Sequence, residues 1–64
     1  MKPKNKIKYF REKRELTQVE LGRILGISQT AVSLYESGDR NPDVEMAKAI
    51  AKALNQTLDA IFAP

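Results

Sequence analysis

The stretch LTQVELGRILGISQTAVSLYESG, from Leu16 to Gly38, decides the fold of this chain. Within it, Thr17 is followed three residues later by Glu20, which is the spacing of a capping box. In a capping box the hydroxyl and the carboxylate each accept a hydrogen bond from the other residue's backbone N–H, which pairs donors that the helix itself leaves unpaired. The pattern therefore predicts a helix that begins at about Gln18.

The same stretch predicts where this helix ends and where a second one begins. Leu21 and Leu25 form an apolar stripe with helical spacing, and Gly26 supplies a residue that tolerates positive φ at a helix end. Ser28 then provides a second hydroxyl cap, so we expect the next helix to run from about Gln29 to Ser37. The inward face and the end of that helix are predicted at Val32, Tyr35 and Gly38.

Two short helices joined by a tight turn predict a helix-turn-helix, in which the second helix lies in the major groove of DNA. Any αα-hairpin would show caps, a glycine and two apolar stripes, so other features must favour this motif. Gly22 and Ala31 are small enough for a close contact between the two helices. Gln29, Thr30 and Ser33 are predicted to point outward, and their amide and hydroxyl groups are of the kind that pairs with base edges.

Composition narrows the possible classes of protein. The 64 residues are predicted to form a single domain, residues 1–64. A core of this size supplies only ~3–5 kcal/mol of stability, so extra stabilisation from a dimer would help. The absence of Cys and His excludes disulfides and the usual zinc or thiol chemistry. The carboxylates fall mainly at predicted caps and exposed positions, so nothing indicates an enzyme, a cofactor or a metal site.

The chain carries no signal for a membrane or for export. No apolar run approaches the ~20 residues that a membrane span requires, and no signal-peptide core follows the basic start. We therefore expect a soluble, cytoplasmic protein without a membrane partner. No small-molecule effector is implied either.

Positive charge is concentrated in the first half of the chain. Residues 1–30 hold eight Lys or Arg and three acidic residues, whereas residues 31–64 hold three and five, which together give the net charge of +3. Such a charge run is often only a solvated helix face. Beside a helix-turn-helix it favours nucleic acid, because neutralised phosphates supply most non-specific affinity for DNA. Seven of the basic residues precede Glu15: Lys2, Lys4, Lys6, Lys8, Arg11, Lys13 and Arg14.

Three further helices are predicted around this pair. The first runs from about Lys4 or Asn5 to Arg14, and the fourth is capped by Asp43 and extends to Leu54. Asn55, which can adopt a left-handed conformation, follows the fourth helix. The last helix is capped by Thr57 and contains Leu58, Ile61 and Phe62.

Three blocks of sequence, in register with one another, resemble the lambda repressor/Cro (Xre) family of DNA-binding domains. They are IKYFREKRELTQ, ELGRILGISQTAVSLYESGDRNPD, and AKAIAKALN followed by TLDAIF, and they cover almost the whole chain. Within them LTQ-x-x-L, GIS-x-x-x-V-S and ESG-x-R-x-P fall in the family's order and spacing. The resemblance implies an all-α, compact five-helix lambda repressor-like domain whose second and third helices form the helix-turn-helix.

The resemblance also implies which residues contact bases. Gln29 matches the principal reading position, and its amide can bond adenine through N6 and N7. Thr30 and Ser33 match neighbouring positions, from which a hydroxyl can reach base edges or phosphate. Leu34 departs from family members that carry Gln there, and it could meet a thymine methyl or shield the interface.

Phosphate contacts are implied in the same way. Gln18 matches a position that contacts phosphate and braces the first residue of the recognition helix. In the loop after that helix, Arg40 and Asn41 match positions that contact the DNA backbone, although the neighbouring Asp39 is unfavourable beside phosphate. Further phosphate contacts are expected from Ser28, Lys4 and Lys6.

Arg11 and Glu36 occupy positions that form a partly buried ion pair between the first and third helices in several relatives. The alternative is that they are two unrelated surface charges. Removing one partner of a fully buried pair would strand the other charge, at a cost of ~3–5 kcal/mol.

The predicted function is that of a sequence-specific transcriptional regulator, a repressor, that binds double-stranded DNA. Specific affinities of ~10⁻⁸–10⁻¹¹ M exceed what three short polar side chains on one helix can supply. We therefore expect a homodimer on an inverted-repeat operator, with an interface in the C-terminal segment around Leu58, Ile61 and Phe62. The alternative is a protein-interaction module on the same fold, such as an antitoxin or antirepressor partner.

Overall fold

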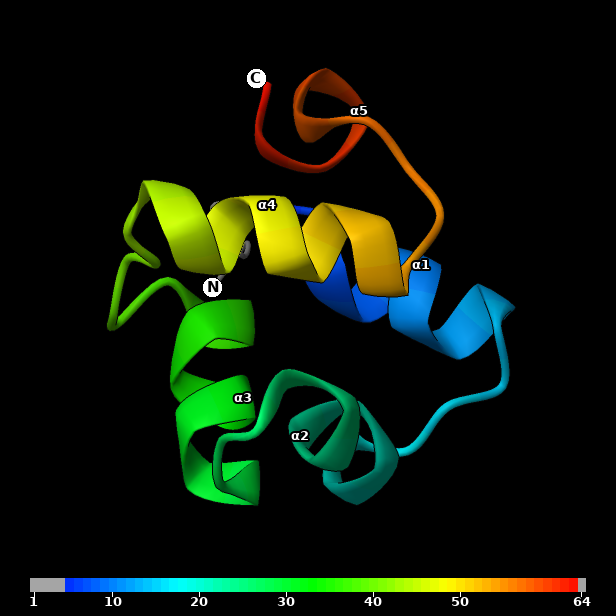
Figure 1. Ribbon diagram of the computed structural model, residues 1–64, viewed down its shortest axis with the longest axis vertical. Coiled ribbons are helices and arrows are strands. Elements are labelled where there is room, and N and C mark those ends of the chain that lie inside the picture. Colours follow the sequence, from blue (N-terminus) through cyan, green and yellow to red (C-terminus); the bar gives the residue numbers. More distant parts are fainter. Residues whose placement is uncertain (1–4, 64) are drawn as a thin grey trace.

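The computed structural model describes residues 5–63, which form five helices (Figure 1). The helices are α1 (Ile7–Lys13), α2 (Gln18–Leu25), α3 (Gln29–Ser37), α4 (Val44–Ala53) and α5 (Leu58–Phe62). No strand occurs in the described part of the chain. The prediction of an all-α fold with five helices is therefore confirmed.

Side-chain caps begin the four helices that follow α1. The Thr17 hydroxyl accepts a hydrogen bond from the Glu20 N–H at 3.0 Å, and the Glu20 carboxylate accepts one from the Thr17 N–H at 2.8 Å, so the predicted capping box is present. Hydrogen bonds from Thr17, first of all from its backbone N–H, lower the pKa of the Glu20 carboxyl. The hydroxyl of Ser28, the carboxylate of Asp43 and the hydroxyl of Thr57 cap α3, α4 and α5.

Four helices are followed by a residue of positive φ; α3 ends at Gly38 (φ 86°), and the other three, α1, α2 and α4, share one further hydrogen bond. Gly26 (φ 73°) and Asn55 (φ 54°) adopt this conformation after α2 and α4, as predicted. Glu15 (φ 56°) does so after α1, which the sequence did not predict. In each of these three cases the next residue donates its N–H to a carbonyl five positions earlier, for example Leu16 to Arg11 at 3.1 Å. These bonds pair carbonyls that the helix end leaves unpaired.

Helix α1 is shorter than predicted. It was expected to begin at Lys4 or Asn5, but Lys4 lies outside the described residues and the helix begins at Ile7. The Asn5 side chain instead accepts a hydrogen bond from the Ile7 N–H and donates one to the Tyr35 carbonyl at 2.8 Å. The Lys6 N–H donates to the Ile61 carbonyl at 2.9 Å. The segment before α1 is therefore bound to α3 and α5 instead of extending the helix.

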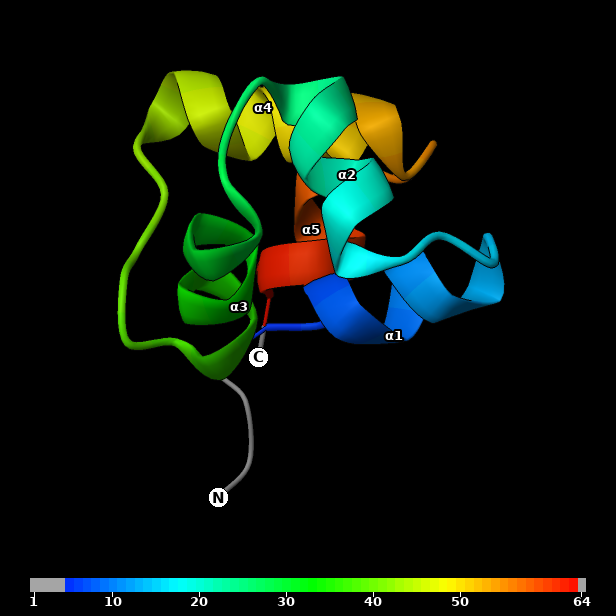
Figure 2. The same ribbon diagram turned by 90° about the horizontal axis from the view of Figure 1, so that it is seen from below.

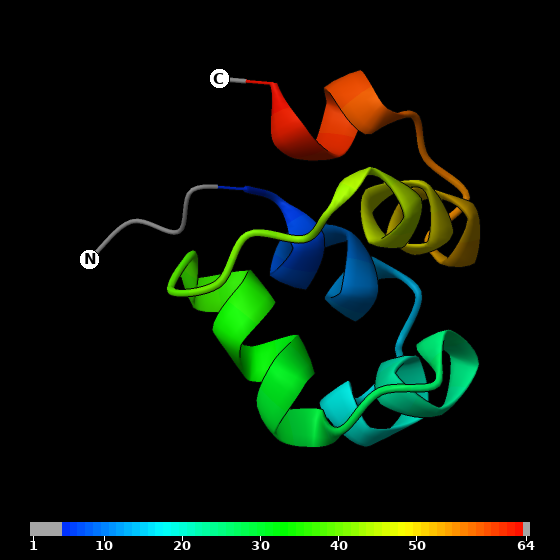
Figure 3. The ribbon, with the colours of Figure 1, turned by 60° about the vertical axis from the view of Figure 1, so that its left-hand side comes forward.

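Each helix contributes a fully buried side chain to one core. These side chains are Ile7, Leu21, Val32, Ile50 and Ile61, and Leu54 joins them from the end of α4. Figures 1 and 3 show the pair α2 and α3 at the opposite end of the domain from α5. Figure 2, which views the domain from below, looks onto the beginning of α3.

The turn between α2 and α3 is packed tightly against Gly22. A Cβ atom at this position would lie only 2.7 Å from the Ile27 carbonyl oxygen. The predicted need for a small residue is confirmed, but the nearest neighbour is the backbone of the turn and not Ala31. Because this contact fixes the turn, it also fixes the angle at which α3 leaves α2.

The prediction that Ile61 lies in the dimer interface is wrong. Ile61 is fully buried among the core side chains of its own chain, because α5 turns this position inward against α4. Leu58 is 40% exposed and Phe62 is partly buried. Only these two of the three predicted residues are therefore open to a partner.

Candidate nucleic-acid interface

Helix α3 presents a polar surface at its beginning. Gln29, Thr30 and Ser33 are exposed, whereas Leu34 is half-buried. Ala31 and Val32 lie between them in sequence and face the interior, which follows from the helical period. The three polar side chains that were predicted to read bases therefore share one outward face, to which Leu34 adds a smaller apolar area.

A chain of polar side chains runs from the interior to this surface. Arg11 and Glu36 are buried, with 8% and 5% of their surface exposed, and the Arg11 Nε lies 2.5 Å from Glu36 Oε2. The Gln18 Nε2 donates to Glu36 Oε1 at 3.0 Å, and the Gln29 Nε2 donates to Gln18 Oε1 at 3.3 Å. We call these four residues the polar relay. It links the beginning of α3 to α1 and α2 through hydrogen bonds.

The predicted ion pair is thus present, and it is more deeply buried than two surface charges would be. Arg11 also donates through Nη1 to the Leu16 carbonyl at 2.7 Å and through Nη2 to Glu36 Oε1 at 3.4 Å. Among the described residues, every buried side-chain nitrogen and oxygen has a hydrogen-bond partner. The charges of Arg11 and Glu36 are therefore both neutralised and hydrogen-bonded, as burial requires.

Two of the predicted phosphate contacts lie beyond the far end of α3. Arg40 and Asn41 are exposed in the loop that follows this helix, and the Arg40 N–H donates to the Leu34 carbonyl at 3.2 Å. The carboxylate of Asp39 accepts a hydrogen bond from the Ser37 hydroxyl at 2.9 Å. Since a nine-residue helix is about 14 Å long, polar groups are available at both ends of α3.

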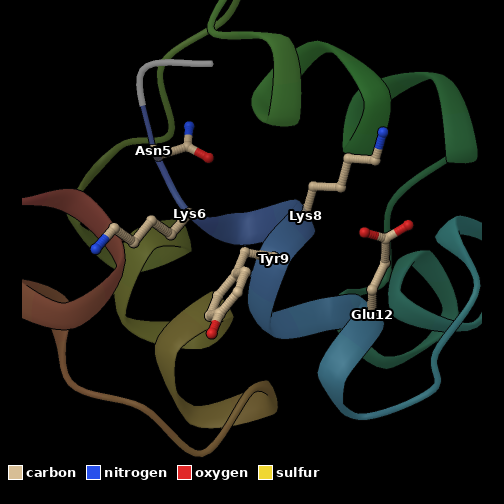
Figure 4. Close-up of a pocket in the computed structure, with 5 residues that line it drawn as sticks. All are labelled: Asn5, Lys6, Lys8, Tyr9 and Glu12. Atoms are coloured by element: carbon tan, nitrogen blue, oxygen red, sulfur yellow. The ribbon is translucent and has the colours of Figure 1, made fainter. Parts of the chain in front are cut away.

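The other predicted phosphate contacts differ in how far the structure describes them. Ser28 is exposed, and its hydroxyl oxygen accepts the cap bond from Ala31, which leaves the hydroxyl hydrogen to donate elsewhere. Lys6 is exposed before α1, whereas Lys4 lies outside the described residues. Figure 4 shows the Lys6 and Lys8 side chains pointing in different directions from the beginning of α1. The side chains of Lys6 and Lys8 therefore do not extend toward the same side of α1.

The sequence did not reveal that Gln18 reaches Glu36. These residues are 18 positions apart, and their hydrogen bond depends on how α2 packs against α3. Only the bracing of Gln29 by Gln18 was predicted, through the resemblance. No local pattern of residues signals the remaining link.

The described part of the chain has neither a metal-binding cluster nor a membrane-spanning helix. Between residues 5 and 63, His, Cys, Asp and Glu side chains do not gather in groups that could hold a metal ion. None of α1 to α5 has both the length and the hydrophobicity to cross a membrane.

Comparison with known proteins identifies the family. A family model described as Helix-turn-helix matches residues 7–61. An uncharacterized HTH-type transcriptional regulator of Methanocaldococcus jannaschii is 37% identical over 59 residues, which are 92% of this chain and 89% of that protein. The HTH-type transcriptional activator BcrR of Enterococcus faecalis is 37% identical over 57 residues, which are 89% of this chain and 28% of that protein.

A solved structure agrees with these matches. The P22 c2 repressor, crystallised with a synthetic operator, superposes with a TM-score of 0.80 at 33% sequence identity. The match covers 84% of this chain and 82% of that chain. Together with the geometry of α2, the turn and α3, these likenesses show that the chain belongs to the Xre/lambda repressor-like helix-turn-helix family.

Proposed function

We propose that this domain is a sequence-specific regulator of transcription that binds double-stranded DNA with α3 in the major groove. The observation that carries the proposal is the exposed polar face of Gln29, Thr30 and Ser33, which the core does not need. The likeness to a repressor crystallised with operator DNA supports the same ligand. We assign the protein to the cytoplasm, where its DNA would be.

Each polar residue has a role in this proposal. Gln29 reads an adenine through N6 and N7, a bidentate contact worth ~1–3 kcal/mol of discrimination. Thr30 and Ser33 contact neighbouring base edges or phosphate, and Leu34 contacts a thymine methyl or shields the interface from water. Ser28 and Gln18 donate to phosphates beside the beginning of α3. Further phosphate contacts come from Arg40, Asn41, Lys6 and Lys4.

We also propose that the protein binds as a homodimer. Non-specific affinity is typically ~10⁻⁴–10⁻⁶ M, and two copies that read two half-sites can reach the tighter binding that a regulator requires. Half-sites lie about 34–36 Å apart, so each α3 would be about 17 Å from the two-fold axis. The domain measures 26 × 23 × 22 Å, so two copies in direct contact can satisfy this spacing.

An apolar groove between α4 and α5 is the surface we assign to the dimer. Val44 at its edge is 66% exposed and Leu58 is 40% exposed. Large apolar side chains that are exposed together mark an interaction surface more often than isolated ones do. The groove is lined by Asn41, Pro42, Val44, Ala47, Leu58 and Phe62.

The role in transcription that we propose is repression, because a bound dimer that overlaps a promoter blocks it without further contacts. BcrR, a relative named as an activator, represents the competing possibility. Reporter expression from a promoter that carries the selected site distinguishes the two, since a repressor lowers expression and an activator raises it.

Selection of bound sequences from a random pool of duplex DNA, at near-physiological salt, tests the binding proposal. An enriched inverted repeat with centres about one helical turn apart is the expected result. An enriched site without symmetry would contradict the dimer, and retention that vanishes with salt without enrichment would contradict sequence-specific binding. Gln29→Ala should relax the preference at one position of each half-site.

The dimer surface has its own test in sedimentation of the free and DNA-bound protein. Val44→Asp places a charge at the edge of the groove and should weaken dimerisation. Ile24→Asp is the matched control, because Ile24 is also an exposed apolar residue, at 57%, but lies on α2 outside the groove. Equal dimerisation of both variants would remove the groove from the interface.

A further inference from the structure

The hydrogen bonds of the polar relay have a fixed donor-to-acceptor direction, and Glu36 sets that direction. A carboxylate can only accept hydrogen bonds, whereas an amide side chain offers one end that donates and one that accepts. The Glu36 carboxylate is held by two bonds from Arg11, so it cannot turn away. Gln18 must therefore present its Nε2 to Glu36, as the 3.0 Å hydrogen bond indicates.

The orientation of Gln18 determines the orientation of Gln29. With Nε2 bound to Glu36, the Oε1 of Gln18 faces Gln29 and can only accept. Gln29 must then supply its own Nε2, which lies 3.3 Å from that oxygen. One hydrogen on Nε2 and the whole of Oε1 remain on Gln29 for contacts outside the protein. The side chain thus presents one donor and one acceptor in a set order.

Burial makes this order costly to reverse. If Gln18 rotated by half a turn, its Oε1 would face the carboxylate of Glu36, which is only 5% exposed. Glu36 would keep its bonds from Arg11, but the Gln18 oxygen would face another acceptor without a donor of its own, which is unfavourable for a group shielded from water. Gln18 itself is half-buried, so solvent gives it little compensation.

We infer that Glu36 is a positioning residue which, through Gln18, fixes the order of donor and acceptor on Gln29 and thereby sets its base preference. The inference rests on the proposed function. Adenine offers an acceptor at N7 and a donor at N6, which match one donor and one acceptor. Guanine offers acceptors at both N7 and O6, so the Gln29 oxygen held in this order would oppose an acceptor.

Glu36→Gln tests the inference, because it keeps the shape of the side chain but can donate as well as accept. Gln18 could then adopt either orientation. Binding is measured to four versions of the selected site, with each base in turn at the position that responds to Gln29→Ala. A bidentate contact accounts for roughly 5- to 150-fold of preference. We expect Glu36→Gln to lose at least about threefold of the preference for adenine over guanine.

Two controls separate positioning from a loss of stability. Ile50→Val removes a methylene group from the core, away from the relay, and should weaken binding to all four sites equally or not at all. Glu36→Gln in the background of Gln29→Ala should leave base preference unchanged, because the group through which Glu36 acts is gone. All measurements are made where circular dichroism shows that each variant is folded.

Gln18→Met is the second variant, in case Glu36→Gln does not fold. It breaks the relay without touching the ion pair, and the loss of a phosphate contact affects all four sites alike, so it cancels in the ratio. If Gln29→Ala changes the preference but Gln18→Met and any folded Glu36→Gln do not, the positioning role is refuted and the proposed function stands. If Gln29→Ala changes nothing, the proposed reading residue is itself refuted.

Discussion

Replacing Gly22 by Ala should destabilise the domain, although alanine is the better helix former. Alanine in a helix interior gains about 0.5–1 kcal/mol over glycine. Against this, the new Cβ would lie 2.7 Å from the Ile27 carbonyl oxygen, and the turn must retreat by at least 0.3 Å to reach the shortest separation that real Cβ atoms show, 3.0 Å. Overpacking of this kind costs about 1–3 kcal/mol, which leaves a net loss of up to about 2.5 kcal/mol, centred near 1 kcal/mol.

Thermal unfolding followed by circular dichroism measures this loss. For a domain of this size, each kcal/mol lowers Tm by about 4–8 °C. Gly26→Ala is the comparison, because nothing lies within 4 Å of a Cβ at Gly26 and its cost comes from φ +73° alone. The two causes separate with asparagine, which tolerates positive φ but still carries a Cβ. Gly26→Asn should recover most of the stability that Gly26→Ala loses. Gly22→Asn should not recover the stability that Gly22→Ala loses.

DNA binding provides a second measurement on the same variants. Because the turn sets the direction of α3, Gly22→Ala should weaken binding to the selected site even at temperatures where the protein is folded. A Gly22→Ala protein as stable as the unsubstituted one, with unchanged affinity, would refute the claim that this contact fixes the turn.

Three further predictions concern Arg11, Glu20 and Glu15. Arg11→Met leaves the Glu36 carboxylate buried without its partner, at a cost of about 3–5 kcal/mol, so circular dichroism should show a largely unfolded protein. The double variant Arg11→Met/Glu36→Leu should fold again, and its failure to fold would contradict the reasoning. The pKa of Glu20 is lowered by folding, so the stability it contributes is present above its ordinary pKa of 4.5 and is lost as pH falls through the folded value. Urea unfolding at successive pH values should show that loss, and Glu20→Gln, which keeps the hydrogen bond without titrating there, should reduce it. Glu15→Gly relieves a φ of 56° and should gain about 0.5–1 kcal/mol, which an unchanged Tm would contradict.

Features that depend on neighbours in sequence could be predicted, and features that depend on distant contacts could not. The caps at Thr17, Ser28 and Asp43 involve residues three positions apart, so their spacing alone indicates them. The beginning of α1 was placed too early because Asn5 is bound to Tyr35, 30 positions away. Positive φ at Glu15 has no residue signature, since glutamate is rarely chosen for that conformation.

The same distinction holds for the surface of α3 and for α5. Helical periodicity sufficed to predict that Gln29, Thr30 and Ser33 are exposed. It also grouped the apolar residues of α5, but it could not tell that Ile61 faces the core, because that depends on where α4 lies. The roles of Gln29, Thr30 and Ser33 toward DNA remain predictions that the selection experiment tests.

The hydrogen bond from Gln29 to Gln18, which connects the surface of α3 to the interior, suggests how domains of this kind diverge in the sites they bind. Thr30 and Ser33 belong neither to a cap nor to the core, and substitutions at such surface positions usually change stability by no more than about 0.5 kcal/mol. A gene duplicate could therefore acquire a new target by changing these two residues one at a time. A change at Gln29 is different, because its amide partner, Gln18, would have to change with it. Libraries built to retarget the domain should vary residues 30 and 33 independently and residues 18 and 29 as a pair.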